Sequence, residues 1–194
     1  MVLITGFEAF DSFDVNPSGV IAEALDGEEL DSVLLCGVVL PVDFNASVEV
    51  IGDMISLYHP VLVLSLGLEA RTKVIHVENI GVNLRRDPYA NGRDSWLRRI
   101  DTRGPFFRWS SLPTSAIVRE LRDEGVPARQ SWFAGTYICN TMLYTILGSL
   151  DSQGYTFKTG FLHVPLLSSQ DPEGMDLGMM LEAVKTTIRV SLET

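Results

Sequence analysis

Short, uniformly apolar runs alternate along this chain with segments whose apolar residues recur every three or four positions. The uniform runs predict buried strands at residues 2–5, 32–40 and 61–66. The periodic segments predict amphipathic helices at residues 17–25, 41–57, 115–124 and 175–192. Apolar strands separated by a helix are typical of a parallel sheet covered on both faces. The pattern therefore predicts an α/β fold, a three-layer α/β/α sandwich in one domain at residues 1–194.

Residues 131–150 combine a short apolar run, a break at Ala134-Gly135 and a helical repeat. Thr136 is the predicted N-cap, and Cys139 lies near the first turn on the apolar stripe. Unpaired N–H groups and the positive end of a helix dipole stabilise a thiolate there, so the order of strand, turn and helix indicates a nucleophile. The alternative is a structural thiol, because free cysteine is among the most buried residue types.

A base within reach of the sulfur would decide between these readings. His163 lies in a second apolar run, GFLHVPLL, predicted as a strand at 158–164. The separation of 163 − 139 = 24 positions allows a helix, a turn and a strand between the two residues, and sulfur with imidazole forms the pair that nucleophilic catalysis needs. A hydrogen-bonded core histidine is the alternative. Glu78, in a predicted strand at 74–83, must be paired if buried, or else it faces solvent from an edge strand.

Composition excludes several classes of protein. A net charge of −10 argues against nucleic-acid and anionic-membrane partners, and no apolar run is long enough to span a bilayer. Two cysteines at 139 − 36 = 103 positions apart and the absence of a signal-peptide pattern predict a cytoplasmic protein. No cofactor or metal is expected, because the histidines lack ligand spacing and no glycine-rich phosphate loop precedes a helix.

Five motifs occur in order: ITGFEAFDSFDVNPS, VIHVENIGVN, WSSLPT, GTYICN and GFLHVPLLSSQ. Together they resemble the pyroglutamyl peptidase I (pyrrolidone-carboxylate peptidase) family of cysteine peptidases, from the first residues to about Gln170. The resemblance implies a mostly parallel, mixed sheet of the phosphorylase/hydrolase-like kind. It also implies hydrolysis of the bond after an N-terminal pyroglutamyl residue, with Cys139 as nucleophile, His163 as base and Glu78 as the third member.

The same resemblance implies a pocket for the pyroglutamyl ring and an oligomeric state. The residues expected to bind substrate are Phe10, Phe7, Tyr137, Ile138, Leu68 and Asn16. The implied partners are peptides with an N-terminal pyroglutamate, and the implied assembly is a homotetramer, as is common among bacterial members.

The chain departs from the family pattern after the glutamate. Members usually carry Asp-Ala-Arg-Ile-Pro-Asp-Asn some ten residues beyond it, whereas this chain reads LRRDPYANGRD and has Pro88 there. Arg85 or Arg86 is the candidate to replace the arginine that supports the active site. The departure leaves two alternatives open: a related Cys-His-Glu hydrolase for another acyl group, or a catalytically weak binding protein on the same scaffold.

Overall fold

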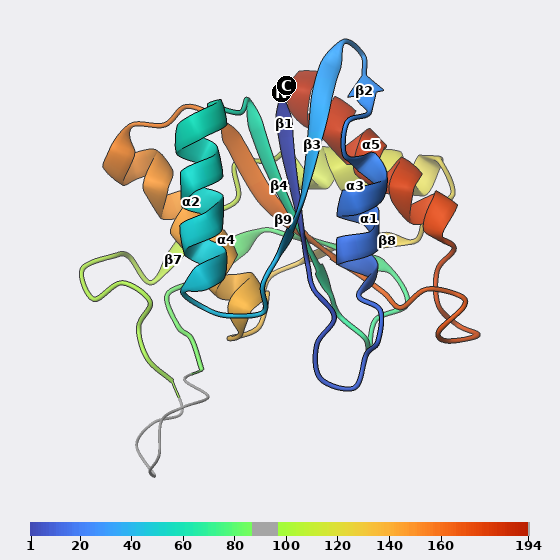
Figure 1. Ribbon diagram of the computed structural model, residues 1–194, viewed down its shortest axis with the longest axis horizontal. Helices are drawn as coiled ribbons and strands as arrows, with labels where there is room; N and C mark the ends of the chain where they lie inside the picture. The colour runs from blue at the N-terminus through green and yellow to red at the C-terminus, as the bar shows by residue number, and fades with distance from the viewer. Residues whose placement is uncertain (87–96, 194) are drawn as a thin grey trace.

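The computed structural model describes residues 1–86 and 97–193, and Pro88 therefore lies outside the described residues. A seven-stranded sheet forms its centre (Figure 1). From one edge to the other the strands are β2 (Glu29–Leu30), β3 (Val33–Leu40), β1 (Val2–Phe7), β4 (Leu62–Leu68), β9 (Lys158–Val164), β5 (Ile75–Glu78) and β8 (Ala128–Ser131). The four strands β3, β1, β4 and β9 run parallel. At the edges, β2 is antiparallel to β3, and the parallel pair β5–β8 is antiparallel to β9. The sheet is therefore mixed and mostly parallel, as predicted.

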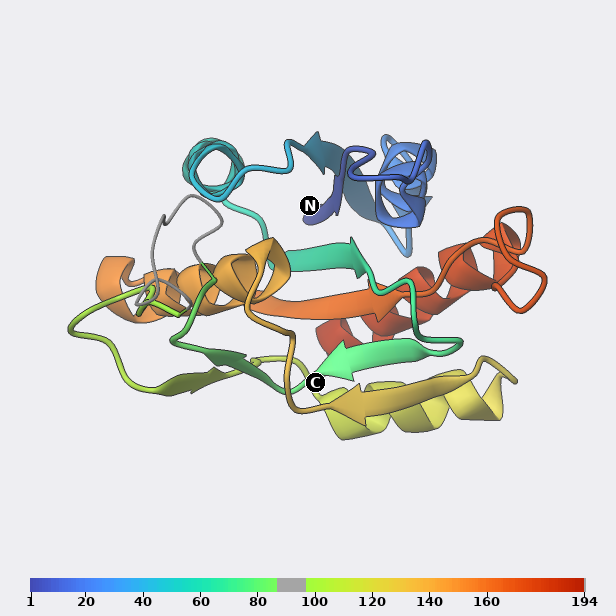
Figure 2. The same cartoon turned by 90° about the horizontal axis from the view of Figure 1, so that it is seen from below.

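Helices cover both faces of this sheet (Figures 1 and 2). One layer packs apolar side chains of α1 (Pro17–Leu25), α3 (Thr114–Asp123) and α5 (Leu177–Glu193) against it. The other layer packs those of α2 (Ala46–Tyr58) and α4 (Ile138–Gln153). The three-layer sandwich is confirmed. The strands β1, β4, β9 and β5 are buried because each face meets a helix layer, whereas β3, predicted as buried, is mostly half-buried.

The predicted strand at 74–83 is divided in the structure. Its first half is β5, and its second half becomes β6 (Ile80–Val82), which pairs with β7 (Phe107–Trp109) in a separate two-stranded sheet. The division occurs at Asn79, whose N–H donates to Ser131 O and whose carbonyl accepts from Ser110 N, each at 2.8 Å. These bonds turn the chain from the main sheet toward α4, which packs on β6.

Candidate active site

Cys139 lies in the first turn of α4, directly above β4. A Cβ placed on Gly67 would lie 2.9 Å from the Cys139 sulfur, so the glycine leaves the space that the thiol occupies. The N-cap of α4 is Tyr137, so the prediction of Thr136 was wrong by one residue. The Tyr137 side chain makes no hydrogen bond to the helix. Because the first N–H groups of a helix have no partner within it, the start of α4 offers free donors beside the sulfur.

His163, near the end of β9, faces both Cys139 and a buried carboxylate. Its Nδ1 lies 2.7 Å from Oε1 of Glu78, at the end of β5. Glu78 is 1% exposed and His163 is 6% exposed, so the pair is shielded from water. With Nδ1 held by the carboxylate, Nε2 is the nitrogen available for the Cys139 sulfur, which lies close enough to raise the pKa of the ring.

The charges around His163 favour its protonated form. Burial, the largest influence, lowers the pKa of the imidazole, but the negative sulfur of Cys139 and the Glu78 carboxylate outweigh it and raise the pKa from 6.5 to about 10. An imidazolium beside a thiolate is the state that can attack a carbonyl and then protonate a leaving group.

A cavity of about 240 Å³ opens next to the sulfur. All six predicted substrate-binding residues line it, together with Cys139 and His163; the six are Phe7, Phe10, Asn16, Leu68, Tyr137 and Ile138. Asn16 bridges the two sides of the loop after β1, because its Oδ1 accepts from Ser18 N at 3.1 Å and its Nδ2 donates to Glu8 O at 2.9 Å. Asn16 thus fixes the loop after β1, and the remaining predicted residues give the cavity an apolar wall.

Four further residues line the cavity that were not among the predicted substrate-binding residues: Val42, Glu69, Ala134 and Gly135. Val42 and Glu69 follow β3 and β4, where ligands of parallel sheets bind. Their position after a strand was the available signal, since neither lies in a motif.

Comparison with known proteins agrees with this geometry. The model of the pyroglutamyl peptidase family matches residues 1–194. The chain belongs to this family. It is 35% identical to the pyrrolidone-carboxylate peptidase of Pyrococcus furiosus, covering 99% of this chain and 98% of that protein. It is 32% identical to the pyrrolidone-carboxylate peptidase of Bacillus licheniformis, over 98% of this chain and 89% of that protein.

Solved structures of family members superpose closely on this one. The pyrrolidone carboxyl peptidase from Thermococcus litoralis gives a TM-score of 0.91 at 32% identity, covering 99% of this chain and 93% of that one. A mutant of the Pyrococcus furiosus pyrrolidone carboxyl peptidase gives a TM-score of 0.92 at 33% identity, covering 99% of this chain and 98% of that one. The fold is therefore that of the pyroglutamyl peptidases.

In this family member, Asn140 holds the start of α4 in place. Its fully buried amide accepts from Val82 N and donates to Val82 O and Leu84 O, each at 2.8 Å. Just before the helix, the Thr136 carbonyl accepts from Arg86 N at 2.6 Å. The segment after β6 therefore lies alongside the nucleophile turn.

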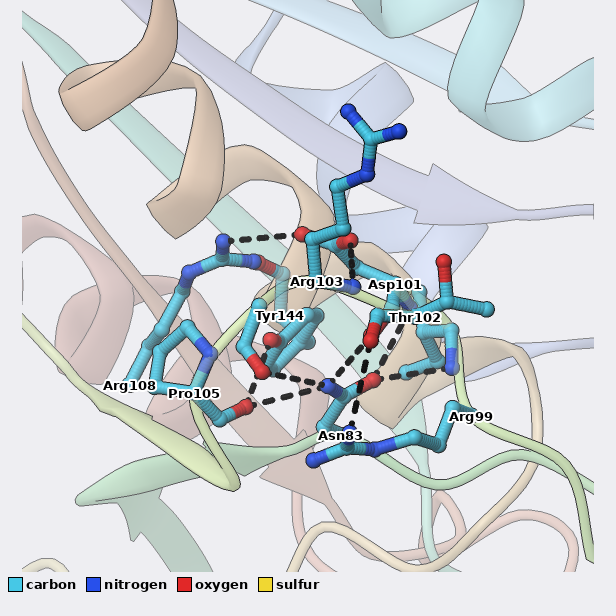
Figure 3. Close-up of polar contacts among 10 residues, drawn as sticks. Asn83, Arg99, Asp101, Thr102, Arg103, Pro105, Arg108 and Tyr144 are labelled. Carbon is cyan, nitrogen blue, oxygen red and sulfur yellow. Dashed lines mark hydrogen bonds and ion pairs between the residues drawn. The ribbon is translucent and has the colours of Figure 1, made fainter.

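Asn83 fixes the far end of the same segment (Figure 3). Its Oδ1 accepts from Ile100 N and Asp101 N, both at 2.9 Å. Its Nδ2 donates to Asp101 O at 2.7 Å and to Pro105 O at 3.0 Å, and the Tyr144 hydroxyl reaches Pro105 O at 2.8 Å. The returning chain at 100–105 is thus tied to β6 and α4, which makes Asn83 a structural residue of this peptidase fold.

The two candidate arginines of the altered segment have different contacts. The Arg85 guanidinium lies 5.5 Å from the ring centroid of Phe44, and that ring packs edge-on against Tyr137 of the cavity at 5.1 Å. The backbone of Arg85 pairs with that of Arg98, and Arg86 donates its N–H to Thr136. Arg85 therefore contacts the cavity wall indirectly, since it packs on Phe44 and Phe44 packs on Tyr137, which lines the cavity.

His76 occupies a buried position opposite His163 in the antiparallel pairing of β5 and β9. Its Nε2 accepts from Arg129 Nε at 2.8 Å and lies 2.8 Å from the Thr72 hydroxyl. A guanidinium N–H can only donate, so this nitrogen is unprotonated and the ring is neutral. Burial first and Arg129 second lower the pKa of His76.

Neither a metal-binding group nor a membrane span is found in the part of the chain that the structure describes. No three His, Cys, Asp or Glu side chains of the described residues converge as a metal ion would require. Among the same residues, no helix has the length and apolarity to cross a bilayer.

Proposed function

We propose that this protein is a cysteine omega-peptidase that releases pyroglutamate from the N-terminus of peptides. The observation that carries the proposal is the Cys139–His163–Glu78 arrangement at the mouth of an apolar cavity, in a chain of the pyroglutamyl peptidase family. The lactam ring of pyroglutamate is uncharged, which suits a wall formed by Phe7, Phe10 and Tyr137.

In the proposed reaction the Cys139 thiolate attacks the pyroglutamyl carbonyl carbon and forms a C–S bond. Free N–H groups in the first turn of α4 stabilise the negative charge that moves to the carbonyl oxygen. The intermediate collapses as the C–N bond breaks, and His163 gives its proton to the departing amine. Water then attacks the thioester, His163 takes a proton from it, and pyroglutamate leaves with the thiolate restored.

The role proposed for Glu78 is to orient His163 and to stabilise its positive charge. The contact of 2.7 Å at Nδ1 directs Nε2 toward the sulfur, and the carboxylate favours the imidazolium. Glu78 does not line the cavity, so it acts on the substrate through the histidine.

The direct test is release of an amine reporter from a pyroglutamyl amide, with a prolyl amide as the control substrate. We expect turnover of the lactam substrate alone and its loss after alkylation with iodoacetamide. Cys139→Ala should abolish turnover while its unfolding transition stays close to that of the wild type. Equal turnover of both amides, or activity that survives in Cys139→Ala, contradicts the proposal.

We also propose that the protein is cytoplasmic and forms a homo-oligomer, a tetramer by analogy with bacterial members of the family. The two cysteines Cys36 and Cys139 are free thiols, which supports a reducing compartment. Exposed aromatic side chains around β7 support association of copies, and the test is described below. Cell fractionation checks the location, and detection in a secreted fraction would contradict it.

A further inference from the structure

The cavity has two chemically different halves, which meet at Cys139. The sulfur lies above Gly67 of β4, the strand between β1 and β9. On the β1 side the wall comes from the apolar residues Phe7, Phe10 and Val42 and from Asn16, whose amide is hydrogen-bonded within the loop after β1. On the β9 side the lining includes His163 and Glu69.

This division fixes the direction in which a substrate lies. The proton donor must reach the nitrogen of the departing amine, so that nitrogen belongs on the His163 side of the sulfur. The uncharged ring then occupies the apolar half over β1. The residue that follows pyroglutamate consequently lies over β9, beside Glu69.

Glu69 is held at that place by the turn after β4. Its N–H donates to Val164 O, next to His163 in β9, at 3.0 Å, and its carbonyl accepts from Thr72 N at 3.0 Å. Its Oε1 accepts from Arg71 N at 3.3 Å. Among the described residues that line the cavity, Glu69 is the one that carries a carboxylate, and it is partly exposed to solvent.

The two arginines near this turn, Arg71 and Arg129, do not line the cavity. Arg71 is exposed on the same turn but is not part of the lining. Arg129 directs its Nε–H toward His76. The β9 half thus holds the His163 imidazolium, which serves the departing amine, and the Glu69 carboxylate, which is the charge available to the side chain that follows pyroglutamate.

We propose that Glu69 selects substrates by the charge of the residue after pyroglutamate, favouring lysine or arginine and disfavouring aspartate or glutamate. This inference rests on the proposed peptidase function and adds a substrate class to it. Because Glu69 is partly exposed, the effect is that of a screened ion pair, about threefold in kcat/KM between a basic and a neutral residue.

The experiment is a competition among three peptides, pyroglutamyl-Lys, pyroglutamyl-Ala and pyroglutamyl-Glu, each followed by the same alanine amide. Pyroglutamate release from each is measured at low and at high salt. The wild type should prefer the lysyl peptide and discriminate against the glutamyl peptide, and both effects should shrink at high salt. Glu69→Gln should remove the differences, and Glu69→Lys should reverse their order.

Glu29→Gln is the matched control, because Glu29 is exposed on β2 at the far side of the sheet and has the same charge. It should keep the wild-type order of the three peptides. Equal rates for the lysyl and glutamyl peptides in the wild type, or an unchanged ratio in Glu69→Gln, overturns the proposal for Glu69 alone. Absence of turnover with all three peptides instead overturns the proposed function, and the inference with it.

Discussion

Two neighbours, the Cys139 sulfur first and the Glu78 carboxylate second, set the protonation state of the proposed base. Burial alone would lower the pKa of His163, and the charges of Cys139 and Glu78 raise it to about 10 instead. The imidazolium therefore persists well above pH 6.5, and the enzyme keeps its proton donor into the alkaline range. Activity should fall on the alkaline side only as pH approaches the raised pKa of His163.

Glu78→Gln should lower kcat/KM on the order of 100-fold and move the alkaline limb of its pH profile to lower pH, because the variant loses the charge that supports the imidazolium. The folded-state pKa of His163 lies above its ordinary 6.5, so the stability gained from this pair is fully present below about pH 6.5 and is lost as pH rises toward 10. Denaturant unfolding across this range measures it. Glu78→Asp keeps the charge and should retain part of the activity; an unshifted limb in Glu78→Gln would refute the assignment.

His76 should remain neutral at pH values where an ordinary histidine takes up a proton. Protonation of Nε2 would oppose the N–H of Arg129, and burial already disfavours the charge. Arg129→Gln should therefore raise the pKa of His76 toward 6.5. Long-range ¹H–¹⁵N NMR of the imidazole nitrogens measures this pKa and shows which nitrogen carries the proton. A wild-type His76 that is already cationic at pH 6.5 would contradict the expected neutral form.

At the scale of elements, the packing of α4 on β4 depends on the missing side chain of Gly67. An added Cβ would lie 2.9 Å from the Cys139 sulfur and 2.8 Å from Cζ of Phe161, so Gly67→Ala must displace one of them. We expect a loss of activity on the order of 100-fold, because small displacements of a nucleophile carry penalties of this size. Steady-state kinetics measures it.

Gly52→Ala is the matched control for this substitution. A Cβ on Gly52, in the exposed face of α2, would meet no atom within 4 Å. Since alanine is favoured over glycine in a helix, this variant should gain about 0.5–1 kcal/mol of unfolding free energy at unchanged activity. Full activity in Gly67→Ala would show that the sulfur does not lie where the structure places it.

Asn140 connects α4 to β6, and its removal should loosen the nucleophile turn. Asn140→Ala leaves the Val82 N–H buried without its partner, which costs about 1–3 kcal/mol of unfolding free energy. We expect a lower denaturation midpoint and reduced kcat. Asn45→Ala is the comparison, because Asn45 is the exposed N-cap of α2 and makes no capping bond. A midpoint equal to that of Asn45→Ala would contradict the role given to Asn140.

The ends of elements show what the apolar pattern could not predict. The helix expected at 41–57 begins at Ala46, because the Asp43 carboxylate accepts from Asn45 N and Ala46 N and holds the preceding residues out of the helix. The helix that carries Cys139, whose apolar repeat lies within residues 131–150, continues to Gln153. At Gly148, within this helix, an added Cβ would collide with Nη1 of Arg108, so this glycine makes room for a side chain of another element.

The site was more predictable than these boundaries. Motifs identified Cys139, His163 and Glu78, and the structure brings them together, although their catalytic roles stay predictions. The positions of Asn83 and Asn140 could not be inferred in the same way, because each acts through backbone groups far along the chain. Glu69 belongs to no motif, and its position directly after β4 was the signal that placed it near the site.

The surface of the whole molecule carries three aromatic side chains in mutual contact, here termed the aromatic surface: Phe107, Trp109 and Trp132. Their rings meet edge to face, at 5.8 Å between Phe107 and Trp109 and 5.9 Å between Trp109 and Trp132. The three are 45%, 60% and 57% exposed, although each is large and apolar. Contiguous exposed apolar area of this kind marks interaction sites in soluble proteins.

We expect this aromatic surface to mediate association between copies of the chain. A combined Trp109→Ser and Trp132→Ser variant should have a lower mass than the wild type in analytical ultracentrifugation, since it removes most of the apolar area that association would bury. Leu57→Ser is the control: Leu57 is 68% exposed on α2, away from the aromatic surface, and should leave the mass unchanged. A net charge of −10 opposes association at low ionic strength, so salt should favour the oligomer. A monomeric wild type at all salt concentrations, or a double variant of unchanged mass, would exclude this surface as the interface.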